Sequence, residues 1–180
     1  YQPGRINYEE GLRLLREMAA STLLSTAVSS PHFRAICHSI MQAHASTRER
    51  LPILDHFYQT TLASLPPIHT VLDLACGLNP FALPWMNLPE ETSYRVYDLH
   101  RPRICLIDEF LRNLGRPDCA HNQDILTNPP QVQADLALFF KEAHRFEQRA
   151  RGCNRDFWIS LPVKKIAVSL PTSSLSGRHD

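Results

Sequence analysis

Val71-Leu-Asp-Leu-Ala-Cys-Gly-Leu-Asn-Pro80 is typical of a buried β-strand that runs into a tight glycine turn. Gly77 stands where a side chain would keep a ligand away from the backbone, so the turn is suited to present N–H groups to a cofactor. The dinucleotide fingerprint G-x-G-x-x-G is not matched here, because Gly77 is the only glycine of the stretch and Pro80 stands where a phosphate-binding helix would begin. The turn therefore favours S-adenosylmethionine, which has no pyrophosphate, over NAD.

Beyond residue 70, short apolar runs alternate with helical patterns, which is typical of a parallel sheet covered by helices on both faces. We expect an α/β fold of the Rossmann-like type. Helices are expected at 102–114, where Gly115 is the stop signal, and at 142–151 and 155–161. The expected strands are 70–75, 94–97, 119–121, 134–140 and 165–170.

The chain before residue 66 carries helical patterns throughout. Apolar side chains recur at helical spacing over 8–20, from Pro31 to His44, and over 51–65, where Pro52 is expected to kink or restart the helix. We therefore expect a helical N-terminal subdomain, 1–65, followed by a sheet domain, 66–180.

Composition and length indicate a globular chain with one sizeable core. The 180 residues are 43% hydrophobic and 21% charged. No run approaches the roughly 18 apolar residues that span a bilayer, and no signal segment opens the chain, so a cytoplasmic location without membrane attachment is expected. The cysteines are odd in number and lack metal-ligand spacing, so we expect free thiols and no metal site; they are Cys37, Cys76, Cys105, Cys119 and Cys153.

The formal net charge of +1 conceals an uneven distribution. Between residues 141 and 165, seven basic side chains stand against three acidic ones. Two interpretations stay open: a solvated helix face, or a patch that contacts the phosphates of a nucleic acid. The basic residues are Lys141, Arg145, Arg149, Arg151, Arg155, Lys164 and Lys165.

Acidic residues follow two of the expected strands. In parallel sheets, ligands bind beyond the carboxyl ends of the strands. Asp98 would accept hydrogen bonds from two ribose hydroxyls, with Leu99 against the adenine, and Asp124 would accept from the adenine amino group, with Ile125 on the ring. One such Asp alone is typical of a loop or a helix cap, whereas two in order after a glycine turn favour a cofactor site. The turn residues of that site would be Ala75, Gly77 and Asn79.

Three stretches together resemble one known family. They are His44-Ala-Ser-Thr-Arg-Glu-Arg-Leu51, the stretch 71–80 followed by Leu83-Pro-Trp-Met86, and Ser169-Leu-Pro-Thr-Ser-Ser-Leu175. In this order and at this spacing they resemble the 16S rRNA (guanine-N7)-methyltransferases that confer aminoglycoside resistance, over roughly residues 35 to 178. The resemblance implies S-adenosylmethionine as cofactor, and methyl transfer to guanine N7 in the decoding site of the small ribosomal subunit. For the oligomeric state, a monomer is the simpler expectation.

The resemblance also implies the architecture of a class I methyltransferase, with strand order 3-2-1-4-5. A methyltransferase of this fold ends its sheet with an antiparallel hairpin. After Leu170 only ten residues remain, too few for two strands and a turn. We therefore expect the C-terminal hairpin to be missing from this chain.

Further site residues come from the resemblance alone. In the family, the first of the three stretches borders the cofactor, which implies roles for His44, Thr47 and Arg50, with Arg50 as a clamp on the methionine carboxylate. The alternative is that this stretch only caps a helix. Phe140 would stack on the adenine or on a flipped base, with core packing, the commoner fate of Phe, as the alternative. Lys141 matches a lysine of the family, but the Ala143-His144 that follows departs from the usual Leu-Pro.

The implied partner is 16S rRNA. Lys141, Arg145, Lys164 and Lys165 would contact it, and the helical subdomain would dock rRNA and cover the cofactor. No catalytic base is expected, because guanine N7 carries no proton and needs only alignment with the methyl donor. Two alternatives stay open: a methyltransferase that acts on a small molecule, and a truncated relative that binds cofactor or RNA without transfer.

Overall fold

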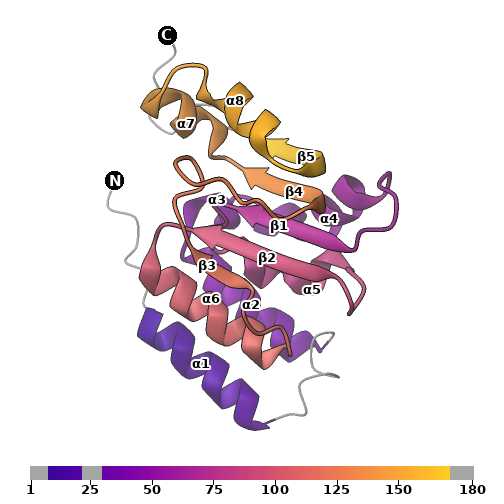
Figure 1. The fold of residues 1–180 in the computed structure, drawn as a ribbon. Coiled ribbons are helices and arrows are strands. Elements are labelled where there is room, and N and C mark those ends of the chain that lie inside the picture. The colour runs from indigo at the N-terminus through magenta and orange to yellow at the C-terminus, as the bar shows by residue number, and fades with distance from the viewer. Residues whose placement is uncertain (1–7, 22–29, 171–180) are drawn as a thin grey trace.

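The computed structural model describes residues 8–21 and 30–170 (Figure 1). Its centre is a sheet of five parallel strands in the order β3-β2-β1-β4-β5, which confirms the predicted order. Residues 171–175 of the third family-like stretch, and the expected absence of a hairpin after Leu170, lie outside the described residues. The strands are β1 (Thr70–Leu74), β2 (Ser93–Asp98), β3 (Ala120–Asn122), β4 (Ala134–Phe140) and β5 (Val163–Ser169).

The longer helices form close to where the sequence predicts them, with one expected helix divided in two, whereas the four-residue helices at 45–48 and 83–86 were not predicted. The stretch 51–65 begins as a 3₁₀ turn, η2 (Leu51–Ile53), and continues as α4 (Leu54–Leu62), because Pro52 has no N–H to donate. A second 3₁₀ turn, η3 (Asn79–Ala82), follows the glycine turn. The other helices are α1 (Tyr8–Ser21), α2 (Pro31–Gln42), α3 (Ala45–Arg48), α5 (Leu83–Met86), α6 (Arg101–Asn113), α7 (Ala143–Arg149) and α8 (Cys153–Ser160).

Each face of the sheet has its own hydrophobic core, because successive side chains of a strand point to opposite faces. In β4, Leu138 belongs to a core that also contains side chains of α1, α2, α4, α5 and α6, whereas the next residue, Phe139, belongs to a core with side chains of α7 and α8. Leu15, Phe33 and Tyr58 of the helical segment 1–65 belong to the first of these cores, so that segment and the sheet share buried contacts. Every central strand is covered on both faces, as expected for a parallel sheet.

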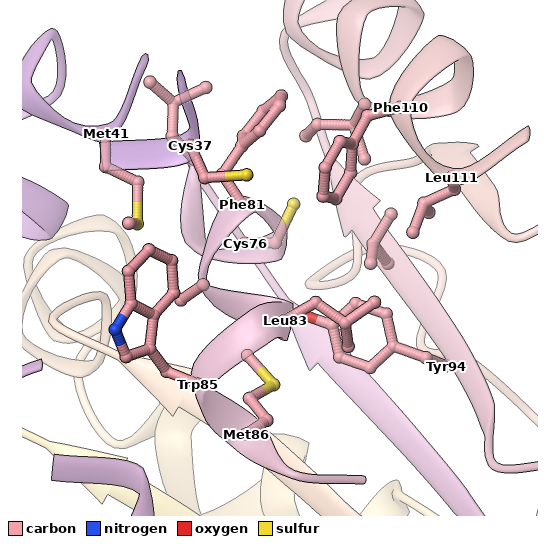
Figure 2. Packing of buried hydrophobic residues seen from close by; sticks show 14 of the residues in the cluster. Cys37, Met41, Cys76, Phe81, Leu83, Trp85, Met86, Tyr94, Phe110 and Leu111 are labelled. Atoms are coloured by element: carbon pink, nitrogen blue, oxygen red, sulfur yellow. The ribbon is translucent and has the colours of Figure 1, made fainter. Parts of the chain in front are cut away.

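The Leu83-Pro-Trp-Met86 stretch lies inside the first core (Figure 2). Trp85 and Met86 are buried, and the indole N–H of Trp85 donates to Asp55 Oδ1 at 3.0 Å. In the same core, the rings of Phe81 and Phe110 pack with centroids 4.5 Å apart. This stretch therefore serves the packing of the helices against the sheet.

No helix in 8–21 or 30–170 is long and apolar enough to cross a membrane. Over the same residues, no group of His, Cys, Asp and Glu is arranged to hold a metal ion. All five cysteines are free.

Candidate functional site

A cavity of about 380 Å³ lies at the carboxyl ends of the strands, where parallel sheets bind their ligands. Eight of the residues predicted from the sequence line it: His44, Ala75, Gly77, Asp98, Leu99, Asp124, Ile125 and Arg145. The structure thus brings together residues that are up to 101 positions apart, the interval from 44 to 145. The other predicted residues, Thr47, Arg50, Asn79, Phe140, Lys141, Lys164 and Lys165, are not part of its lining.

The glycine turn is held against the end of β2. Ala75 and Gly77 both have positive φ, 49° and 57°, a conformation that favours glycine. The Gly77 N–H donates to Asp98 Oδ2 at 3.0 Å, and the Cys76 N–H donates to the Tyr97 carbonyl. A Cβ at Gly77 would lie 3.1 Å from His44 Cε1, so a side chain there would require the imidazole to move by a few tenths of an ångström.

Asp98 is saturated with hydrogen bonds from the protein. Its side chain is 7% exposed and accepts from the backbone N–H groups of Gly77 and His100. Nη1 of Arg103 donates to both carboxylate oxygens, at 2.8 and 3.0 Å. An ionised carboxylate offers about four acceptor positions, and all are used here. A ribose at this carboxylate would therefore take the place of the Arg103 guanidinium.

Asp124 lies on the far side of the cavity, beyond β3. Its Oδ1 accepts from the Leu126 N–H and its Oδ2 from Arg149 Nη2 at 3.1 Å. Burial alone would raise the pKa of Asp124, but the hydrogen bond from Arg149 and the Leu126 N–H bring it below its usual value. Ile125 beside it is buried, whereas Leu99 at the end of β2 is 58% exposed. The cavity thus has a carboxylate and an apolar side chain at each of two strand ends.

His44 covers the glycine turn as a neutral ring. Burial, and then the charge of Arg103, lower the pKa of His44 to about 4, so its imidazole is uncharged near pH 7. Its Nδ1 lies 2.9 Å from Ser46 Oγ. Thr47, predicted to lie beside the cofactor, instead points inward, and its hydroxyl donates to the carbonyls of Met41 and His44. It ties α2 to α3 and does not face the cavity.

Arg50 is buried behind the lining of the cavity, at its Gly77 end. Its Nη2 donates to Asn79 Oδ1 at 2.9 Å, and Asn79 is two residues beyond Gly77. The guanidinium carbon lies 4.8 Å from the ring centroid of Phe140 and 5.5 Å from that of Phe57. Its Nη1 is buried and has no hydrogen-bond partner among the described residues. A buried guanidinium in this state is suited to bind an anion.

The predicted lysines lie in two different places. Lys141 follows β4 with a φ of 62° and pairs with Glu49, so it joins the end of the sheet to the segment after α3. Lys164 and Lys165 lie near the start of β5, which pairs with the start of β4. Because the strands are parallel, that end is opposite to the cavity. Lys164 there pairs with Asp135 at 2.7 Å.

Six lining residues were not predicted: His100, Arg103, Gln123, Glu142, Phe146 and Arg149. Glu142, Arg145, Phe146 and Arg149 are spaced as one face of a helix, so an amphipathic pattern in 142–151 was the signal available for them. Glu142, directly before α7, lines the cavity, and burial there raises the pKa of its carboxyl. His100 caps α6 and places Arg103 one turn later, over Asp98.

The sequence and the structure are both similar to those of known rRNA methyltransferases. Residues 8–180 match the family model described as "Ribosomal RNA methyltransferase (FmrO)". The chain is similar to the 16S rRNA (guanine(1405)-N(7))-methyltransferase of Micromonospora echinospora, 37% identical over 145 residues, covering 81% of this chain and 53% of that protein. The enzyme of the same name from Serratia marcescens is 38% identical over 138 residues, covering 77% and 53%. The chain spans about half the length of these curated relatives.

Solved structures with this fold include two rRNA methylases. The 16S rRNA methyltransferase RmtF in complex with S-adenosyl-L-homocysteine superposes with a TM-score of 0.72 at 29% identity, covering 95% of this chain and 60% of that one. The 16S rRNA methylase RmtB superposes with a TM-score of 0.70 at 32% identity, covering 89% and 61%.

Proposed function

The chain belongs to the FmrO family of ribosomal RNA methyltransferases, and from that premise we propose that it transfers a methyl group from S-adenosylmethionine to guanine N7 of 16S rRNA. The target would lie in the decoding site of the small ribosomal subunit, in the cytoplasm, and its modification would confer resistance to aminoglycosides. The protein would act as a monomer. The curated relatives that carry this activity in their names support the proposal.

One observation carries the cofactor assignment: the cavity joins the glycine turn to a carboxylate at each of two neighbouring strand ends. Asp98 would accept from the ribose hydroxyls once Arg103 withdraws, and Leu99 would lie against the adenine. Asp124 would accept from the adenine amino group, with Ile125 on the ring. Gly77 leaves room for the sulfur-bearing chain close to the backbone.

The residues at the Gly77 end fit the methionine part of the cofactor. Arg50 has a buried Nη1 without a partner in the described part of the chain, and a carboxylate would supply both the missing acceptor and the opposite charge. His44 is neutral and would lie beside that chain without repelling a sulfonium. The cavity volume of about 380 Å³ is in the range of small-molecule sites.

Methyl transfer to guanine N7 requires no proton transfer by the protein. When bound, S-adenosylmethionine supplies an electrophilic methyl group on its sulfonium. Guanine N7 has a free lone pair and no proton, so we assign no general base; the chain would hold both partners in line and exclude water. The ring of Phe140 lies against the Arg50 guanidinium in the structure. In this arrangement it would affect the adenine or a flipped base through Arg50 and not by direct stacking.

We also propose which parts face the RNA. Arg145 and Lys141 lie at the cavity end of the sheet and would contact phosphates near the target, with the helical segment 1–65 docking rRNA and covering the cofactor. Lys164 and Lys165 lie at the opposite end, so any contact they make with RNA would be remote from the target base.

The test is methylation of small ribosomal subunits by the full-length protein. After incubation with S-adenosylmethionine, the 16S rRNA is cleaved chemically at N7-methylguanine and mapped by primer extension. A new stop in the decoding site is expected, and a much weaker one with Asp98→Asn, because an amide offers one acceptor oxygen where the carboxylate offers two, one for each ribose hydroxyl. Turnover of a free small molecule with no stop in the rRNA would instead indicate a small-molecule methyltransferase.

A further inference from the structure

A network of buried polar side chains lies beneath the glycine turn. Asn79 is at its centre and is 1% exposed. Its Oδ1 accepts from Arg50 Nη2 at 2.9 Å and from the Tyr58 hydroxyl at 2.5 Å. Its Nδ2 donates to Asp73 Oδ2 at 2.8 Å, and that same oxygen accepts from the Tyr94 hydroxyl. The amide of Asn79 therefore separates the only acid of the network from its only cation.

This arrangement leaves the charge of Arg50 uncompensated. Arg50 is 5% exposed and makes no ion pair within the described residues. The acceptor of its hydrogen bond is the neutral amide of Asn79, whereas an Asp at position 79 would have formed an ion pair with Arg50. A guanidinium that is buried without a counter-ion lowers the stability of the folded protein. Its presence here therefore indicates a ligand that supplies the negative charge.

The orientation of Arg50 is fixed on three sides. The rings of Phe140 and Phe57 lie near the guanidinium, within 4.8 and 5.5 Å of its carbon. On one edge Asn79 holds Nη2, and the Tyr58 hydroxyl occupies the other acceptor position of the Asn79 oxygen. Nη1 is the nitrogen that these contacts leave for a ligand.

We infer that Asn79 and Tyr58 are positioning residues that hold Arg50 through an uncharged acceptor and so reserve its positive charge for the carboxylate of the bound cofactor. This inference rests on the proposed function. It assigns to Asn79 a role through Arg50 and not through contact with the cofactor, because the oxygen and the nitrogen of its amide are both hydrogen-bonded within the protein, whereas Arg50 Nη1 is not. Tyr58 contributes by locking the amide in one of its two orientations.

The experiment compares two ligands that differ at the carboxylate end. S-adenosylhomocysteine carries the amino-acid group, whereas 5′-methylthioadenosine keeps the adenosine and the thioether and lacks it. Calorimetry on the full-length protein gives the ratio of the two affinities. The substitution Asn79→Asp keeps the size and the acceptor but places a negative charge beside Arg50. We expect it to weaken S-adenosylhomocysteine binding at least tenfold and to leave 5′-methylthioadenosine binding unchanged.

Two further variants separate positioning from folding. Tyr58→Phe removes one donor and keeps the ring, and should lower the affinity for S-adenosylhomocysteine two- to fivefold, again without effect on 5′-methylthioadenosine. Asn154→Asp is the matched control, because Asn154 is also buried and donates through Nδ2, but to the Ala143 carbonyl and away from Arg50. It should leave the affinity ratio unchanged.

The outcomes are distinguishable. If the ratio of the two affinities is unchanged in both Asn79→Asp and Tyr58→Phe, whether or not both ligands bind more weakly, the two residues have a merely structural role. That result would overturn the inference. If Asn79→Asp fails to fold, Tyr58→Phe alone decides. If the unsubstituted protein binds neither ligand, the proposed cofactor is wrong and the inference falls with it. A shifted ratio in a protein that leaves rRNA unmodified would support the inference and refute only the rRNA substrate.

Discussion

Replacing Asp73 by Asn should change how the stability of this protein depends on pH. Asp73 is 1% exposed, in the middle of β1, and accepts from Asn79 Nδ2 and the Tyr94 hydroxyl. Burial raises the pKa of Asp73 from 3.8 to about 7, against the hydrogen bond from Tyr94, which lowers it. An Asn side chain has nearly the same shape, and its oxygen can accept from the same two donors without a charge to desolvate.

The sign and size of the pH effect on stability follow from this shift in the pKa of Asp73. The folded carboxyl keeps its proton up to about pH 7, whereas the unfolded one loses it near pH 4, so the folded state binds more protons between these values. Stability therefore falls as the pH rises from about 4 to 7 and is constant above. A shift of about three units corresponds to roughly 4 kcal/mol, at about 1.4 kcal/mol per unit. The Asp73→Asn variant lacks this contribution.

Urea denaturation of both proteins at about pH 4.5 and pH 8 measures the effect. The free energy of unfolding of the variant, relative to the unsubstituted protein, should rise by several kcal/mol from the lower to the higher pH. Asp135→Asn is a control without pH dependence in this range: the hydrogen bond from Lys164 lowers the pKa of Asp135 to about 2, so its stabilisation is lost only as the pH falls below about 4, and its effect should be the same at both pH values. A difference between Asp73→Asn and the unsubstituted protein that is the same at both pH values would refute the reasoning.

Three further substitutions test the turn, the carboxylate and the core. Gly77→Ala should weaken S-adenosylhomocysteine binding at least tenfold in calorimetry, because the new methyl meets the His44 ring at 3.1 Å and φ is +57°; unchanged affinity would contradict this. Arg103→Met should strengthen the same binding severalfold by freeing Asp98, and a loss of affinity would show that Arg103 contacts the cofactor. Phe110→Ala should lower the free energy of unfolding by about 3–5 kcal/mol in urea titrations, since its ring is fully buried.

The sheet could be predicted from sequence because its strands are short apolar runs between helical patterns and turn residues. The first strand ends one residue before the predicted boundary, at Leu74, since Ala75 already has a positive φ. The last strand begins at Val163, two residues before the prediction. There Lys164 and Lys165, both exposed, conceal the strand start, because they interrupt the apolar run from which a strand is predicted.

The site was predictable where the backbone alone determines position. Gly77, Asp98 and Asp124 follow strands, and parallel strands bring those points to one edge whatever the side chains do. Arg50 and Asn79 are different, because a long or buried side chain is directed by neighbours from other parts of the chain. The aromatic rings around Arg50 come from α4 and β4, and no local pattern contains both.

The basic segment 141–165 shows why charge density along the sequence does not define a surface. The chain leaves the cavity end of the sheet at Lys141, passes through α7 and α8, and returns at the opposite end to begin β5. Arg145 and Arg149 lie at the cavity, with side chains 58% and 47% exposed, whereas Lys164 is paired with Asp135 at the far end. One run of positive charge is thus divided between two ends of the sheet. Because a crossover always connects opposite ends of parallel strands, strand direction decides which of these charges can act together on one RNA site.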